Sequence, residues 1–179
     1  MLKTARHALT KEELTELPIL LRQVFDFISQ LKAQNPAAAP IQYPKLPSIF
    51  SESLVLHCGP AIFPNAQNLR RGGAVADILF EVGQLTKKVE VKATGQQAFQ
   101  YFGKKDIDAD FLVWLAFGEF FRSQAESHVK IYVLAKPGEV LPNPTKISLA
   151  TFERQAAGKL VRYKGSLRDI IEGRIQRGD

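Results

Sequence analysis

Cysteine is almost absent from this chain of 179 residues, because Cys58 is its only one. An internal disulfide is therefore excluded, and the composition fits a reducing compartment. Histidine is also rare, and the three histidines show no metal-ligand spacing with Cys58: His7, His57 and His128. A zinc site is not expected from this pattern.

Long apolar segments are missing as well. The longest apolar run, residues 111–117, is far too short to cross a bilayer, and no apolar stretch typical of a signal peptide lies near the first residue. We therefore expect a cytoplasmic protein that does not contact a membrane.

Lysine and arginine are in excess over the acids. Twenty-four basic and eighteen acidic side chains give a formal net charge of +6, which favours an anionic partner such as nucleic acid. Hydrophobic residues at 45% and charged residues at 23% are ordinary for a globular protein. At this length we expect a single well-buried α/β core.

Two β-rich runs, residues 74–82 and 87–93, flank the turn-like residues 83–86. This pattern predicts an antiparallel hairpin with a four-residue loop, in which Asp77 lies opposite Lys92 and Leu79 opposite Glu90. Because side chains alternate along a strand, Asp77, Glu90 and Lys92 are expected on one face. The other face is expected to be a core surface made of Ala76, Ile78, Phe80, Val89 and Val91.

Two neighbouring carboxylates resist joint ionisation, so such a pair raises one pKa or recruits a cation. Mg²⁺ suits the pair formed by Asp77 and Glu90, since it takes one or two carboxylates together with waters and phosphate oxygens. The alternative is that these residues form a cross-strand ladder of ion pairs with Glu81 and Lys88.

Asp77, followed by Glu90-Val91-Lys92 on the next strand, resembles the motif of the PD-(D/E)XK nuclease superfamily, which includes many restriction endonucleases and Holliday junction resolvases. The resemblance covers residues 48–135, and Ala76 stands where many members have proline. It implies an α/β fold with a restriction-endonuclease-like core, in which helices flank a mixed central sheet with an antiparallel catalytic hairpin. It also implies Mg²⁺ ligands from Asp77, Glu90 and the carbonyl of Val91, with Lys92 acting on the attacking water.

Further site residues are suggested around this motif. Glu52, on a helix expected to begin at Ser48 and end near residue 59, is the candidate for an additional acid, or else a solvated helix residue. Gln97 either joins the metal site or completes a capping box with Thr94, which predicts a helix over residues 94–105. The candidate DNA-binding residues are Arg70 and Arg71, in an expected loop over residues 65–73, together with Lys104 and Lys105.

The rest of the chain divides into an N-terminal helical arm with a proline-rich connection, residues 1–47, and a core, residues 48–179. A capping box at Thr10 predicts a short helix before Pro18, and a second helix follows over residues 18–33. The apolar stripe of that second helix faces either the core or a second subunit. Buried strands are expected at 111–117 and 129–134, and short C-terminal helices at 151–157 and 166–175, in a basic region.

These expectations together predict a Mg²⁺-dependent endodeoxyribonuclease, of the type II restriction endonuclease kind, that hydrolyses phosphodiester bonds of double-stranded DNA. It would act as a homodimer or as a subunit of a heterodimer, since a double-strand break requires two sites. The alternatives are a Holliday junction resolvase, a DNA repair or mobile-element nuclease, and a DNA-binding module of the same fold that does not cut.

Overall fold

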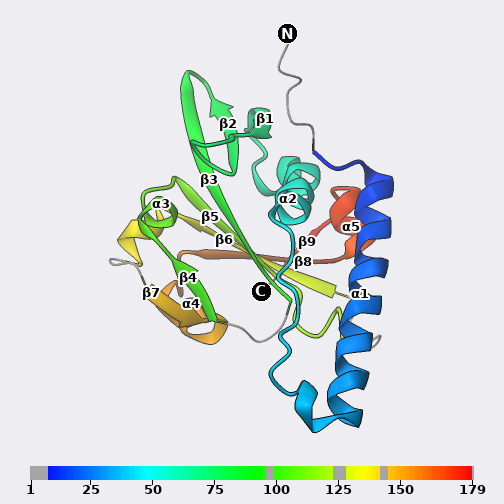
Figure 1. Cartoon of the computed structure of the whole chain (residues 1–179). Helices are drawn as coiled ribbons and strands as arrows, with labels where there is room; N and C mark the ends of the chain where they lie inside the picture. The colour runs from blue at the N-terminus through cyan, green and yellow to red at the C-terminus, as the bar shows by residue number, and fades with distance from the viewer. Residues whose placement is uncertain (1–7, 96–98, 123–127, 142–144, 179) are drawn as a thin grey trace.

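A mixed β-sheet runs through the molecule, which is described here by a computed structural model for residues 8–95, 99–122, 128–141 and 145–178 (Figure 1). Seven strands form it in the order β1-β2-β3-β5-β6-β8-β9. Strands β3 and β5 are parallel, and every other neighbouring pair is antiparallel. The predicted α/β class with a mixed sheet is confirmed. The strands are β1 (Gln67–Arg71), β2 (Ile78–Val82), β3 (Leu85–Thr94), β5 (Phe111–Ala116), β6 (His128–Ala135), β8 (Leu160–Ser166) and β9 (Gln176–Arg177).

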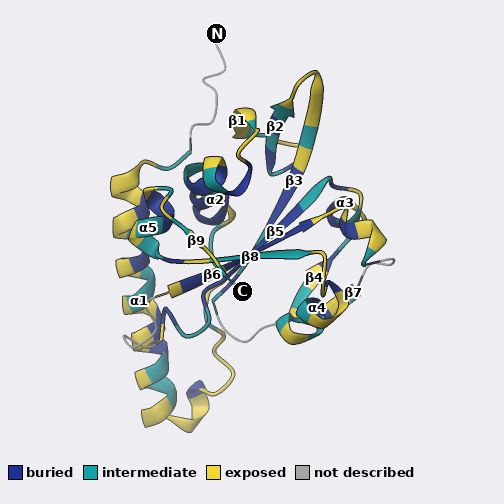
Figure 2. Ribbon diagram, turned by 180° about the vertical axis from the view of Figure 1, so that it is seen from behind, coloured by how far each residue is buried: buried dark blue, intermediate teal, exposed yellow. Residues whose placement is uncertain are grey.

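Helices cover one face of this sheet, and a small second sheet covers the other (Figures 1 and 2). On the first face lie α1 (Lys11–Gln34), α2 (Ser48–Ile62) and α5 (Leu167–Ile171), which pack on the buried side chains of Ile78, Val89, Val91 and Val113. On the second face, β4 (Phe99–Phe102) pairs with β7 (Thr145–Ser148) beside α3 (Lys104–Ile107) and α4 (Leu149–Gln155). The core on this side is aromatic, with Phe102, Trp114, Tyr132 and Phe152.

The β2–β3 hairpin is closed by two residues, not by the four that we predicted. Val82 pairs with Leu85, so only Gly83 and Gln84 form the turn, and Gly83 has the positive φ of +60° that such tight turns require. The register is therefore displaced by two residues, and Asp77 does not lie opposite Lys92. A shift of two leaves each side chain on its predicted face, because the alternation has a period of two.

The connection from β3 to β5 is not the helix that we predicted over residues 94–105. β3 continues through Thr94, residues 99–102 form β4, and α3 is one short turn, Lys104–Ile107. The hydrogen bonds of β4 go to β7, a strand more than forty residues further along the chain, and this distant pairing overrides the local helix signal. Residue Gln97 lies outside the described residues.

Helix α1 runs without a break from Lys11 to Gln34, so the predicted stop before Pro18 is wrong. The capping box is confirmed, since the Thr10 N–H donates to Glu13 and the Glu13 N–H donates to the Thr10 hydroxyl. Pro18 is buried inside the helix, where packing offsets the missing backbone hydrogen bond. Phe25 belongs to the main core, and a 3-10 turn, Pro36–Ala38, begins the proline-rich connection.

Three further segments differ from expectation. The basic stretch at 65–73 contains β1 instead of a loop, and α2 extends through Pro60 to Ile62 with Pro47, not Ser48, at its N-cap. The C-terminal region contains the unpredicted strands β8 and β9, together with a 3-10 turn at Pro137–Glu139 after β6. In the described part of the chain, no helix is both long and apolar enough to span a membrane.

Candidate functional site

Two carboxylates from adjacent strands share one ammonium group. Asp77 directly precedes β2 and Glu90 lies on β3, on the sheet face that carries β4, β7 and α3. The Nζ of Lys105, from α3, lies 3.0 Å from Oε1 of Glu90 and 3.4 Å from Oδ1 of Asp77. The structure therefore brings together the two predicted metal ligands. The lysine between them, Lys105, is one of the residues predicted to bind DNA.

The backbone of β3 fixes the position of Asp77. The N–H of Val91 donates to Oδ2 of Asp77 at 2.8 Å. In an extended strand the N–H and C=O of one residue point to the same side, so the Val91 carbonyl faces the edge where Asp77 lies. Three oxygen donors of the kind that Mg²⁺ prefers are thus gathered at this edge of the hairpin.

Glu90 is the buried member of the pair, since its side chain is 3% exposed while that of Asp77 is 23% exposed. Burial, followed by the negative charge of Asp77, raises the pKa of Glu90 to about 7, although Lys105 acts to lower it. The pKa of Lys105 is itself raised: burial opposes this, but the two carboxylates that accept its hydrogen bonds outweigh burial. The two carboxylates and the ammonium of Lys105 are therefore electrostatically linked, and the carboxylates hold the positive charge of Lys105.

Lys92 lies on the same face of β3 but does not touch this pair. Its Nζ binds Oδ1 of Asp106 at 2.7 Å, and both side chains are largely buried. The other oxygen of Asp106 accepts the N–H of Gly103 at 2.7 Å and so caps α3. Lys92 is therefore held beside the acids by a residue of the same short helix that supplies Lys105.

Asp106 was not predicted as a site residue. Its only sequence signal is its place three residues after Gly103, at a position where an acid commonly caps a helix. Its contact with Lys92 depends on the path of the β3–β5 connection, for which the local sequence pattern wrongly predicted one long helix. Lys104, predicted to bind DNA, is exposed on α3.

Glu52 and the arginines form separate ion pairs. Glu52 is buried on α2 and binds Arg71 at 2.6 Å, on the helical side of the sheet. Arg70, on the opposite face of β1, binds Glu81 at 3.0 Å. Glu81 lies opposite Thr86 and not Lys88, so the alternative ladder of the site residues with Glu81 and Lys88 is not formed. Among the residues that the structure describes, no three His, Cys, Asp or Glu side chains form a group that could hold a metal ion.

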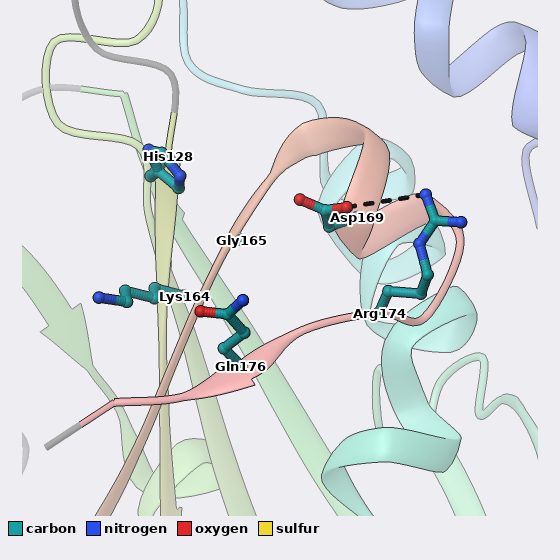
Figure 3. A pocket seen from close by; sticks show the side chains of 6 residues that line it. All are labelled: His128, Lys164, Gly165, Asp169, Arg174 and Gln176. Atoms are coloured by element: carbon teal, nitrogen blue, oxygen red, sulfur yellow. Dashed lines mark ion pairs between the residues drawn. The ribbon is translucent and has the colours of Figure 1, made fainter.

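A separate hollow of about 290 Å³ lies near the β9 edge of the sheet, between β6, β8 and β9 (Figure 3). Its charged lining includes Asp169, which is 3.8 Å from Arg174 and also caps α5 through Ser166. The hydrogen bond from Ser166 is the largest cause that lowers the pKa of Asp169. Asp169 and Arg174 are occupied in holding α5, and the hollow lies on β6, β8 and β9, which β5 separates from the strand that carries Glu90, so it is not the candidate site.

The acid pair is interpreted from the chemistry of the residues that surround it. The site combines a buried carboxylate of raised pKa, a second carboxylate fixed by the backbone, and two lysines on the same sheet face. Comparisons with protein-family models, curated proteins and solved structures found no match to the chain.

Proposed function

We propose that this protein is a Mg²⁺-dependent endonuclease that hydrolyses phosphodiester bonds in DNA, with a restriction-endonuclease-like core. The observation that carries the proposal is the sharing of the Lys105 ammonium by Asp77 and Glu90. Two carboxylates that cannot both ionise at low cost form a cation site, and the raised pKa of Glu90 supports this reading. The net charge of +6 supports a polyanionic substrate.

The donor set fits Mg²⁺ better than zinc or calcium. Mg²⁺ usually keeps several waters and binds through one or two carboxylates plus phosphate oxygens, which matches Asp77, Glu90 and the Val91 carbonyl. A third acid is not needed for such a site. When bound, the ion supplies Lewis-acid polarisation of the phosphate and lowers the pKa of water.

The two lysines have distinct roles in this proposal. In its ammonium form Lys92 would face the scissile phosphate, orient the attacking water, and stabilise the charge that develops on the phosphate oxygens. Only a Lys92 that had first lost its own proton would deprotonate the water. Its partner Asp106 holds the ammonium in place before substrate binds. Lys105, whose side chain is 49% exposed, would leave the carboxylates if a cation bound there, and its ammonium would then be free to contact a phosphate.

Cleavage of linear, plasmid and four-way-junction DNA with and without Mg²⁺ tests this proposal. Asp77→Ala is expected to abolish cleavage while it keeps or strengthens DNA binding, since it removes negative charge that faces phosphate. Glu81→Ala is the control, because Glu81 is an acid of the same hairpin whose partner is Arg70. Cleavage by Asp77→Ala at the rate of the unmodified protein would refute the assignment.

The same assay separates the related roles. Fixed-sequence cutting of linear duplex identifies a restriction-like enzyme, and cutting of junctions in any sequence identifies a resolvase. Nicking of one strand indicates a subunit of a heterodimeric cutter. A homodimer is the arrangement that we propose for double-strand cutting, with α1 as the contact surface, because its side chains of Leu20, Val24 and Phe27 are exposed at helical spacing.

A DNA-binding module that does not cut is the second candidate. It is favoured by the close contacts of Lys105, which already neutralise the acids without a metal. In that case Mg²⁺ has no effect on stability or on DNA binding beyond ionic screening. A titration with Mg²⁺ at constant ionic strength distinguishes the two candidates.

A further inference from the structure

A long groove opens beside the candidate site. Its volume is about 1010 Å³, and its lining extends from Tyr43 and Lys45 in the proline-rich connection, across β3, to the exposed face of β4. Val91 and Lys92 belong to the part of the lining that β3 supplies. A ligand in the groove therefore contacts the same strand that carries the proposed catalytic lysine.

The groove is positively charged. Four lysines line it, and no aspartate or glutamate is among the described residues of its lining: Lys32, Lys45, Lys92 and Lys146. Lys45 and Lys146 are exposed, and they stand on opposite sides, one in the connection and the other on β7. Asp106 balances the charge of Lys92, so the excess positive charge of the walls comes from the other three lysines, and it attracts a polyanion.

Two exposed aromatic rings lie on one face of β4. Phe99 is 62% exposed and Tyr101 is 58% exposed, although both belong to a strand. They are two residues apart and so project from the same face, whereas Phe102 projects from the other face and is fully buried. The core of this layer therefore does not need the two exposed rings.

A lysine accompanies these rings. Lys146 pairs with Tyr101 across the small sheet, and its Nζ lies 6.0 Å from the centre of the Phe99 ring. The face thus joins apolar ring surfaces to an ammonium group, the combination that binds the bases and phosphates of a single strand. Residues two apart on a strand are separated by about 7 Å, which leaves room for a base on each ring.

We propose that this groove binds an unpaired segment of a DNA strand, with bases stacked on Phe99 and Tyr101 and phosphates beside Lys45 and Lys146. Bases of an intact duplex cannot offer their faces to protein rings, because they are stacked on one another. The inference rests on the proposed function for the identity of the ligand as DNA. It specifies the substrate as a duplex with an unpaired segment, whose strand is led along the groove to Lys92.

Binding by the full chain without metal tests this inference, since cleavage cannot then occur. The probe is a fluorescein-labelled oligo(dT) of about 12 nucleotides, followed by fluorescence anisotropy, with a blunt duplex of equal length as the comparison. The protein is expected to bind oligo(dT) more tightly than the duplex. Phe99→Ala and Tyr101→Ala are each expected to weaken oligo(dT) binding by about 5- to 150-fold.

Two control variants make the result specific. Tyr101→Phe keeps the ring and is expected to bind as the unmodified protein does. Leu85→Ala removes a side chain that is 63% exposed at the hairpin tip, and it is expected to change binding by no more than about twofold. Leu85 is at the opposite end of β3 from the groove, about 20 Å from Val91. Circular dichroism checks that each variant is folded.

The outcomes separate this inference from the proposed function. Unchanged oligo(dT) binding by both alanine variants, or tighter binding of the blunt duplex, overturns the inference even if the protein cuts duplex DNA. Ring-dependent binding of oligo(dT) by a protein that cuts no DNA supports the inference and refutes the endonuclease. Ring-dependent binding together with Mg²⁺-dependent cutting at unpaired segments supports both.

Discussion

Replacing Glu90 by glutamine is expected to stabilise the metal-free protein at neutral and higher pH. The folded protein raises the pKa of Glu90 from 4.5 to about 7, so it holds this proton more tightly than the unfolded chain does. The associated stability is fully present below pH 4.5 and is lost as pH rises to about 7. Each pKa unit corresponds to about 1.4 kcal/mol, so the loss at pH 8 is at most about 3 kcal/mol.

Glutamine resembles the protonated acid and does not ionise, so Glu90→Gln avoids this loss. Urea unfolding followed by circular dichroism, in the presence of a chelator, measures the effect at several pH values. The free energy of unfolding of Glu90→Gln, minus that of the unmodified protein, is expected to be near zero at pH 4 and to rise by up to about 3 kcal/mol at pH 8.

Glu81→Gln is the matched control for this experiment. The hydrogen bond from Asn68 is the largest cause that lowers the pKa of Glu81, so its stabilising effect is present above pH 4.5 and lost at lower pH. Glu81→Gln is therefore expected to lose stability at pH 8. Either of two results would refute the argument that the acid pair is destabilised without a metal. One is a change in the free energy of unfolding caused by Glu90→Gln that does not vary with pH, and the other is a loss of stability by Glu90→Gln at pH 8, as in the control.

Three further predictions concern the metal, a buried ion pair and the oligomer. Mg²⁺ at about one hundred times its dissociation constant is expected to raise the free energy of unfolding by about 2.7 kcal/mol, and an equal rise in Asp77→Ala would contradict the ligand assignment. Arg71→Ala leaves the buried Glu52 unpaired and is expected to cost about 3–5 kcal/mol in urea unfolding, whereas Arg70→Ala breaks an exposed pair and costs about 1 kcal/mol or less. Equal losses of unfolding free energy in Arg71→Ala and Arg70→Ala would show that the burial of Glu52 does not depend on its ion pair with Arg71. Phe27→Asp is expected to convert a dimer to a monomer in sedimentation, and an unchanged dimer would reject α1 as the contact surface.

The faces of the hairpin could be predicted from the sequence because they depend only on alternation. Ile78, Val89 and Val91 are apolar at alternate positions, and the structure buries them together. The register could not be predicted, since a two-residue and a four-residue loop give the same faces. The error placed Lys92 opposite Asp77 along the ladder, without changing the side of the sheet on which either residue lies.

The residues around the acid pair were harder to predict than the pair itself. Lys105 and Asp106 reach it only because the β3–β5 connection folds back over the hairpin as β4 and a short helix. The local signal at Thr94 indicated a longer helix, and the pairing of β4 with β7 depends on residues far away in the chain. Contacts of this kind are set by tertiary structure, which no local pattern reports.

The rate of DNA cleavage by Lys92→Gln and Lys87→Gln tests the central claim most directly. Both lysines lie on β3 and each binds one aspartate, Lys92 at 2.7 Å from Asp106 and Lys87 at 2.9 Å from Asp110. The pair of Lys92 is the more buried, with Asp106 7% exposed against 33% for Asp110, so circular dichroism must first show that both variants are folded. With Mg²⁺ in excess, Lys92→Gln is expected to lower the cleavage rate by about 10²- to 10³-fold and Lys87→Gln by no more than about twofold. Equal rates for the two variants, or no Mg²⁺-dependent cleavage by the unmodified protein, would contradict the account.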